Sequence, residues 1–317
     1  MKQFLIKTIS FSGFALIVIF VILFSSNILI SNNQFHKIDS SIKILFLGHS
    51  HPEEAINDSI IVSSRNFARG GEHNFYTFLK ARKLIESNKN VKFVFLEFTN
   101  NQLSNNMIKW ITDYDKTAVF FPNYTSAMNW EDHLFLFKKK QINYLKIQQN
   151  IFFNNINFLI NRERNVLSRR DWGGFYANKR QKVDSILNSQ LKSGSIKIND
   201  LNFELDDTNL IFIDKIKELC ENKGVKLFLI RSPQHSKYKF YDNEAILQKI
   251  KETRYSDIPF LDFNNFPLNN SEFADLEHLN YKGATKFSLF FNKLITDGLL
   301  DSNDPEEMVN KSILNYK

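Results

Sequence analysis

The chain has 317 residues, of which 43% are hydrophobic and 24% are charged, and its formal net charge is +7. This composition excludes a disordered chain, a collagen-like repeat and an array of flexible linkers. The single cysteine, Cys220, excludes a disulfide scaffold and a cysteine-rich zinc module. A mean hydropathy of −0.30 excludes a protein that crosses a membrane many times. The length suits one large domain or two small ones.

The N-terminal segment is the most apolar part of the chain. No Lys, Arg, Asp or Glu occurs from Thr8 to His36, and Phe11–Ile30 is almost continuously apolar. About 20 such residues cross the hydrocarbon core of a bilayer. Lys2 and Lys7 precede the segment, so the positive-inside rule keeps the N-terminus in the cytoplasm.

We therefore expect a single-pass membrane protein with a cytoplasmic stub at 1–7, a signal anchor at 8–30 and an extracytoplasmic main domain, periplasmic or at the cell surface. A cleaved signal peptide is the alternative, but the apolar run is longer than usual and no clear small-residue cleavage site follows it. This topology argues against nucleic acid as a partner, whatever the net charge.

Short apolar runs alternate with helical patterns after a polar tether at 31–42. The patterns predict strands at 43–47, 91–98, 225–230 and 258–263, and helices at about 72–87, 208–222, 243–253 and 281–295. This alternation predicts an α/β domain at 43–300 with a mainly parallel sheet. A helical insertion at about 102–200 interrupts it, and 301–317 is expected to be a polar tail.

A serine follows the first predicted strand, in the segment Leu47-Gly48-His49-Ser50-His51. That position is the carboxyl edge of the sheet, where open α/β sheets bind their ligands. The Ser50 N–H, close to the start of a helix, could face an anion. A serine in such a turn also caps helices, so both interpretations stay open at this point.

A carboxylate and an imidazole stand three residues apart just before the last predicted helix, at Asp275 and His278. At this spacing the carboxylate can accept a hydrogen bond from one ring nitrogen while the other nitrogen faces a hydroxyl, as a general base requires. A helix-capping turn uses the same residue types and remains the alternative.

Taken together, these segments resemble the SGNH (GDSL-like) hydrolase family. The resemblance covers about residues 43–298 apart from the insertion, and its four blocks are Gly48–His51, Asn66–Gly71, Phe98–Asn101 and Asp275–Ala284. His49 stands where the family usually has Asp, and Phe98 stands where the third block usually has Gly. His in place of Asp recurs in membrane-linked relatives that act on surface polysaccharides, including acetyltransferase-like domains.

The resemblance implies a three-layer, flavodoxin-like SGNH fold with Ser50 as nucleophile, His278 as base and Asp275 as its orienting carboxylate. It also implies an oxyanion hole made by the Ser50 N–H, the Gly71 N–H (with Gly70 as the alternative) and the Asn100 side chain. The implied activity is Ser-dependent ester hydrolysis or O-acyl transfer, such as O-acetylation, on an extracytoplasmic glycan or other ester, without a cofactor. The implied partners are acyl-exporting or glycan-assembly membrane proteins. The alternative is a non-catalytic protein of the same fold in a surface-polysaccharide assembly complex.

Four further residues are candidates for substrate binding: His49, Arg231, His235 and Trp172. Arg231 and His235 follow the third predicted strand at the same sheet edge and could hold an anionic group, whereas Trp172 could stack on a sugar ring. A zinc site made by His49, His51, Asp275 and His278 is an alternative. It leaves Ser50 without a role, so we predict no metal.

The positive charge is concentrated in the predicted insertion. Between Lys138 and Lys182 there are 11 Lys and Arg against two acidic residues, a local charge of +9 that leaves −2 for the rest of the chain. A solvated helical face is one explanation. The other is a basic rim that attracts an anionic glycan or lipid headgroups.

Overall fold

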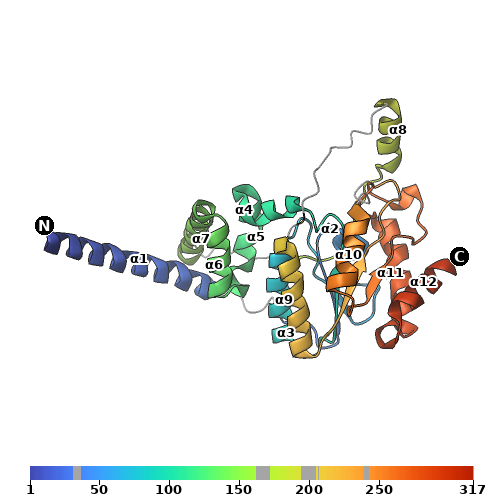
Figure 1. Ribbon diagram of the computed structural model, residues 1–317, viewed down its shortest axis with the longest axis horizontal. Helices are drawn as coiled ribbons and strands as arrows, with labels where there is room; N and C mark the ends of the chain where they lie inside the picture. Colours follow the sequence, from blue (N-terminus) through green and yellow to red (C-terminus); the bar gives the residue numbers. More distant parts are fainter. Residues whose placement is uncertain (31–36, 162–171, 194–204, 206, 239–242, 317) are drawn as a thin grey trace. The chain divides into compact units, whose positions relative to one another are not determined.

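The computed structural model describes residues 1–30, 37–161, 172–193, 205, 207–238 and 243–316 (Figure 1). They fall into two compact units, one made of Met1–Phe35 with Ile111–Ser168 and the other of His36–Trp110 with Arg169–Lys317. The first unit is helical, and the second is a mixed α/β domain with a five-stranded parallel sheet.

The strands of the sheet are β1 (Ile44–Leu47), β2 (Ser64–Asn66), β3 (Phe93–Glu97), β4 (Lys226–Arg231) and β5 (Phe260–Asp262). They lie in the order β2-β1-β3-β4-β5, and every neighbouring pair is parallel. The strand order reverses between β1 and β3, and at such a switch point doubly wound sheets bind ligands beyond the carboxyl ends of the strands. The four predicted strands are present. Sequence analysis missed β2 because its three residues, Ser-Arg-Asn, have neither apolar character nor alternation.

Helices cover both faces of the sheet (Figure 1). On one face α3 (Asn74–Ser87) packs against α9 (Asp207–Lys223), and on the other α11 (Tyr281–Thr296) packs against α2 (Ser50–Ala55). The remaining helices of this domain are α8 (Val183–Ser193), α10 (Glu244–Arg254) and α12 (Pro305–Leu314). Short 3-10 turns complete the described elements, and α4 (Lys109–Thr112) spans the boundary between the two units.

An aromatic stack fixes the register of the central strands. Phe46, Phe95 and Phe228 occupy paired positions on β1, β3 and β4, with ring centroids 5.1 and 4.8 Å apart. Phe291 of α11 lies edge-on to Phe46 and to Phe95, each at 5.3 Å. Edge-to-face and offset rings of this kind bury large apolar areas in favourable geometry. The stack therefore ties α11 to the strands whose ends carry the site.

The helical unit contains α1 (Lys2–Ile30), α5 (Tyr114–Tyr124), α6 (Trp130–Lys139) and α7 (Gln141–Asn161). Within this unit α7 packs against the other three helices. The N-terminal helix α1 is long and apolar enough to cross a membrane, by length and composition.

Two segments differ from their expected organisation. The stretch predicted as one insertion at 102–200 divides, because 111–168 belongs to the helical unit whereas 172–193 returns to the sheet domain. There the Tyr176 N–H donates to the Glu53 carbonyl at 2.8 Å and the Lys182 N–H to the Ala274 carbonyl at 2.9 Å. The end of the chain, expected to be a polar tail at 301–317, forms α12, which packs on β5 with Val309 buried. The segment is polar on average, but α12 has one apolar face, which contains Val309.

Candidate active site

Ser50 lies at the carboxyl end of β1, as the first residue of α2. Gly48 before it has φ +143°, and a Cβ there would stand 2.5 Å from Cβ of Glu97. Only glycine allows the turn to pass this close to β3 in that conformation. The turn brings the Ser50 hydroxyl within 2.8 Å of His278 Nε2.

His278 is held by the loop that precedes α11. Its Nδ1 lies 2.9 Å from Asp275 Oδ1, and the same oxygen accepts the backbone N–H groups of Glu277 at 2.9 Å and His278 at 3.0 Å. Because Nδ1–H donates to the carboxylate, Nε2 is left as the acceptor that faces Ser50. Hydroxyl, imidazole and carboxylate thus stand in the sequence of contacts that nucleophilic catalysis by serine requires.

The electrostatics of this group are those that a general base requires. Burial lowers the pKa of His278, but its hydrogen bond to Asp275 and the carboxylates of Glu54, Asp275 and Glu277 outweigh burial and raise the pKa above its ordinary value. Burial raises the pKa of Asp275, but the hydrogen bond and charge of His278 and two backbone N–H groups lower it to about 2. Asp275 is therefore ionised at neutral pH and stabilises a proton on His278.

A second imidazole, from His49, also contacts Ser50. His49 Nδ1 accepts the Ser50 backbone N–H at 2.8 Å and lies 3.3 Å from Ser50 Oγ. His49 Nε2 lies 3.1 Å from Asn101 Oδ1, so the ring donates its proton to that amide oxygen. Burial lowers the pKa of His49 to about 4 against the nearby charge of Glu97. His49 is therefore neutral and acts as a hydrogen-bonding support.

Next to His49, the side chains of His51 and Glu97 form a fully buried contact. His51 Nδ1 is 2.7 Å from Glu97 Oε1, and Glu97 Oε2 accepts the His49 backbone N–H at 2.9 Å. Burial lowers the pKa of His51 well below its ordinary value and raises that of Glu97. Both shifts favour the uncharged forms. Gln234 Nε2 lies 3.2 Å from His51 Nε2 and closes the network.

The loop before α3 supplies backbone N–H groups beside Ser50. A Cβ at Gly70 would lie 3.6 Å from Ser50 Cβ, and the Gly70 N–H donates to Glu53 Oε2 at 2.8 Å. Gly71 has φ +72° and lies against the Trp110 indole, which a Cβ would approach to 2.6 Å. Across the described part of the chain the Gly71 N–H has no protein acceptor. Burial raises the pKa of Glu53 to about 7, opposed by the Gly70 N–H.

The two asparagines that follow β3 point to different places. The Asn100 amide donates to Glu244 Oε2 at 3.1 Å, and its oxygen accepts from Arg231 at 3.3 Å. Asn101, in contrast, contacts His49 and accepts the Thr99 hydroxyl at 2.6 Å. The Asn101 side chain therefore binds His49, which in turn contacts Ser50, whereas Asn100, the expected oxyanion donor, is bound to Glu244 and Arg231.

The residues expected to contact substrate are bound within the protein. Arg231 is 3% exposed, and its guanidinium pairs with Glu244 at 2.6 Å and with Asp262. His235 lies 3.0 Å from Asn270 Oδ1 and accepts the Lys237 N–H at 3.1 Å. The remaining two, His49 and Trp172, are 3% and 2% exposed. His49 therefore supports the turn that carries Ser50, and Trp172 belongs to the core.

Sequence analysis missed Glu97, Asn101, Glu53 and Glu54. A signal was available for Glu97, the only acidic residue in an apolar run that ends at the sheet edge. Glu53 and Glu54 follow Ser50 by one helical turn, which places them near it on α2. Glu54, 6% exposed, accepts from Asn178 at 2.6 Å, and its pKa is raised by burial.

Two groups of side chains in the described ranges lie close enough together to hold a metal ion. One is His49, His51 and Glu97, and the other is His51, Glu277 and His278. Neither is the set His49, His51, Asp275 and His278 considered from sequence. In the first group, hydrogen bonds to Ser50, Asn101 and the backbone already engage His49 and Glu97.

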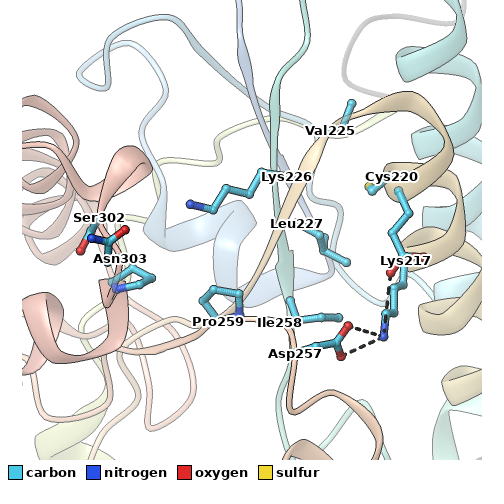
Figure 2. A pocket seen from close by; sticks show the side chains of 12 residues that line it. Lys217, Cys220, Val225, Lys226, Leu227, Asp257, Ile258, Pro259, Ser302 and Asn303 are labelled. Carbon is cyan, nitrogen blue, oxygen red and sulfur yellow. Dashed lines mark hydrogen bonds and ion pairs between the residues drawn. The ribbon is translucent and has the colours of Figure 1, made fainter.

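A cavity of about 360 Å³ lies at the opposite edge of the sheet, beside the amino ends of β4 and β5 (Figure 2). Lys217, which pairs with Asp257 across it, and the buried Cys220 belong to its wall. Burial raises the pKa of the Cys220 thiol to about 12, so the thiol is unreactive at neutral pH. This cavity is separate from Ser50, which lies at the carboxyl edge.

A protein-family model and a solved structure are similar to this chain. A protein-family model matches residues 176–300, less than half of the chain, a range that contains Asp275 and His278 but not Ser50. No curated protein matches the chain. The fold is similar to the crystal structure of a candidate acylhydrolase from Bacteroides fragilis, with a TM-score of 0.38 and 11% identity over 91% of this chain and 98% of that one. The function is therefore inferred from the site alone.

Proposed function

We propose that this chain is a serine-dependent acyl-transfer enzyme of the SGNH type, an ester hydrolase or an O-acyltransferase. The observation that carries the proposal is the pair of contacts at His278, with Ser50 Oγ at 2.8 Å from one ring nitrogen and Asp275 Oδ1 at 2.9 Å from the other. These groups come from segments more than 220 residues apart and meet at the switch point of the sheet. The strand order β2-β1-β3-β4-β5 supports the flavodoxin-like form of the fold.

The reaction proceeds in two halves. His278 Nε2 takes the Ser50 hydroxyl proton as Oγ attacks the ester carbonyl carbon, and the resulting imidazolium is stabilised by Asp275. Collapse of the tetrahedral intermediate breaks the bond to the alcohol oxygen, which receives the proton from His278. Water or an acceptor hydroxyl then gives its proton to His278, attacks the acyl-enzyme and releases Ser50 with its proton restored.

The oxyanion requires hydrogen-bond donors. The Gly71 N–H and the Asn101 amide Nδ2 are the donors that we assign to it, because Gly70 donates to Glu53 and Asn100 to Glu244. The Ser50 N–H is the third donor expected from the resemblance, and it can serve only when His49 Nδ1 releases it. Loss of one such donor typically lowers the rate about 100- to 1,000-fold.

We further propose that the enzyme is anchored by α1 and acts outside the cytoplasm. The length and apolar composition of α1 support an anchor, and Lys2 and Lys7 before its apolar part support a cytoplasmic N-terminus. An ester on a surface glycan is the substrate that fits this location. Membrane proteins that export acyl groups or assemble glycans are the corresponding partners.

Labelling with a fluorophosphonate probe tests the proposal, since the probe reacts with an activated serine. We expect the wild-type chain and Ser59→Ala, which changes an exposed serine on the same domain, to label alike. Ser50→Ala and His278→Ala should not label. Equal labelling of Ser50→Ala and wild type would contradict the assignment of the nucleophile.

One observation favours the second candidate, a non-catalytic protein of this fold in a surface-polysaccharide assembly complex. The Ser50 N–H donates to His49 rather than remaining open for an oxyanion. This alternative predicts glycan binding by wild type and Ser50→Ala alike, with no probe labelling of either. Loss of activity on chelation would instead indicate a metal at His49, His51 and Glu97.

A further inference from the structure

Helix α7 is apolar on two opposite faces. Its inner face carries Ile147 and Ile151, which are 1% and 5% exposed and are buried within the helical unit. Its outer face carries four large apolar side chains that remain exposed: Ile142 at 68%, Leu145 at 56%, Phe153 at 58% and Ile160 at 74%. A surface helix of a soluble domain normally has a polar outer face, so the outer face of α7 needs a partner.

The exposed side chains form a continuous stripe. At 3.6 residues per turn, the positions on one side of the helix are Ile142, Leu145, Gln149, Phe153, Ile156 and Ile160, and five of these six are apolar. At 1.5 Å per residue the stripe is about 27 Å long. Contiguous exposed apolar patches of this kind mark contact with a protein or a membrane.

The helix that packs against α7 indicates that this partner is a membrane. Within the helical unit α7 packs against α1, the helix long and apolar enough to cross a membrane (Figure 1). The outer stripe stays exposed although α1 is in place. A helix that packs on a membrane-spanning helix lies within reach of the bilayer, and its uncovered apolar side then meets acyl chains.

The basic residues beside the outer face of α7 are also consistent with a membrane surface. Lys138, Lys139 and Lys140 are exposed at the junction with α6, and Lys146 is exposed within the first two turns of α7. No acidic residue occurs from Lys138 to Asn161. Basic residues next to an apolar stripe bind anionic headgroups. A symmetric dimer with parallel α7 helices would place the same lysines opposite one another, which disfavours that arrangement of a second copy.

We propose that the outer stripe of α7 inserts into the lipid bilayer beside α1, with Lys138–Lys140 at anionic headgroups. The inference rests on the membrane anchor of the proposed function and extends it. The helical unit is then a membrane-bound element in its own right, which α7 holds at the lipid surface in addition to the single span.

Site-directed fluorescence in lipid nanodiscs tests the inference. The full-length chain with Cys220→Ala is reconstituted in nanodiscs of equal parts phosphatidylcholine and phosphatidylglycerol, and single cysteines carry an environment-sensitive dye. Leu145→Cys reports on the stripe, and Leu289→Cys in α11 is a matched control because the two leucines are 56% and 57% exposed. Ile19→Cys, at a position 54% exposed in α1, reports on the anchor.

With doxyl-labelled lipid as quencher, we expect dyes at 19 and 145 to lose at least half of their fluorescence and the dye at 289 to be unaffected. Quenching at 19 without quenching at 145 would overturn the inference and leave the anchor intact. No quenching at either position would overturn the anchor and the inference together. A blue-shifted but unquenched dye at 145 would show a protein partner and overturn the lipid contact.

A triple lysine variant tests the contact with lipid headgroups. Replacing Lys138, Lys139 and Lys140 by Gln should weaken quenching at 145 in the anionic nanodiscs and leave it unchanged in pure phosphatidylcholine. Equal quenching of this variant and its parent in both nanodiscs would overturn the role of the lysines. Fluorophosphonate labelling of the same samples reports on Ser50 separately, so failure of the lipid contact is distinguishable from failure of the proposed chemistry.

Discussion

Two histidine–carboxylate pairs near Ser50 use the same chemical groups with opposite results. Asp275 lies 2.9 Å from His278, and Glu97 lies 2.7 Å from His51. The pKa of His278 is raised, whereas that of His51 is lowered well below its ordinary value. The side chains of the first pair are 17% and 25% exposed, and those of the second are 1% and 0% exposed.

Burial explains the difference. A carboxylate favours the charged imidazole, but removal of both groups from water favours their neutral forms, and complete burial gives the second effect the greater weight. Of the two pairs, only Asp275–His278 therefore has the electrostatics to accept and return a proton in the proposed reaction. The Glu97–His51 pair fixes the turn that carries Ser50, because Glu97 also accepts the His49 backbone N–H.

The largest expected contrast comes from replacing the carboxyl group of each pair by an amide. Asp275→Asn should lower kcat/KM for a p-nitrophenyl ester about 1,000- to 10,000-fold, since the amide cannot stabilise the imidazolium or hold its tautomer. Glu97→Gln should stay within about tenfold of wild type, because a neutral side chain replaces one whose pKa is already raised. Thermal unfolding of both variants is the control for folding.

A comparable loss in Glu97→Gln at unchanged stability would show that the buried pair carries charge in the reaction. A mild effect of Asp275→Asn would remove the orienting role of Asp275. Either result would contradict the assignment of proton transfer to the Asp275–His278 pair and of a structural role to the Glu97–His51 pair.

The next contrast separates the two asparagines after β3. Asn101→Ala should lower kcat about 100- to 1,000-fold if its amide stabilises the oxyanion, as expected for the loss of one donor. Asn100→Ala should affect mainly the free energy of unfolding, because its amide serves Glu244 and Arg231. A large rate loss in Asn100→Ala with normal Asn101→Ala kinetics would restore the assignment made from sequence.

These contrasts also explain what could be predicted from the sequence. Ser50, Asp275 and His278 lie at ends of predicted elements, and the spacing of Asp275 and His278 is local, so the sequence alone indicates their contact. The choice between Asn100 and Asn101 depends on which way the backbone turns after β3, and two adjacent asparagines carry no signal for that.

Charged residues after strands pose the same difficulty. Arg231 is the last residue of β4, at the expected sheet edge, but its partners Glu244 and Asp262 come from α10 and β5. Contacts between elements decide whether such a side chain faces substrate or the core, and periodicity describes only one element at a time. β2 was missed for a related reason, because its pairing with β1 stabilises a segment without strand-like composition.

The smallest expected effect tests how carboxylates around His278 set its pKa. The proposed reaction requires neutral His278, so kcat/KM should fall as the pH decreases through the pKa of this imidazole, which is raised above 6.5. Glu54 raises that pKa through its charge. Glu54→Gln keeps an acceptor for Asn178 but removes the charge, so protonation of His278 becomes less favourable and the acid limb of the pH profile should move to lower pH. Activity on the alkaline plateau should stay within a few-fold of wild type.

Glu252→Gln, at an exposed position on α10, is the matched control and should leave the pH profile unchanged. A shift of the limb to higher pH in Glu54→Gln would contradict this account of the raised pKa, and a shift as large as that of Asp275→Asn would mean that charge near His278 matters more than the direct hydrogen bond.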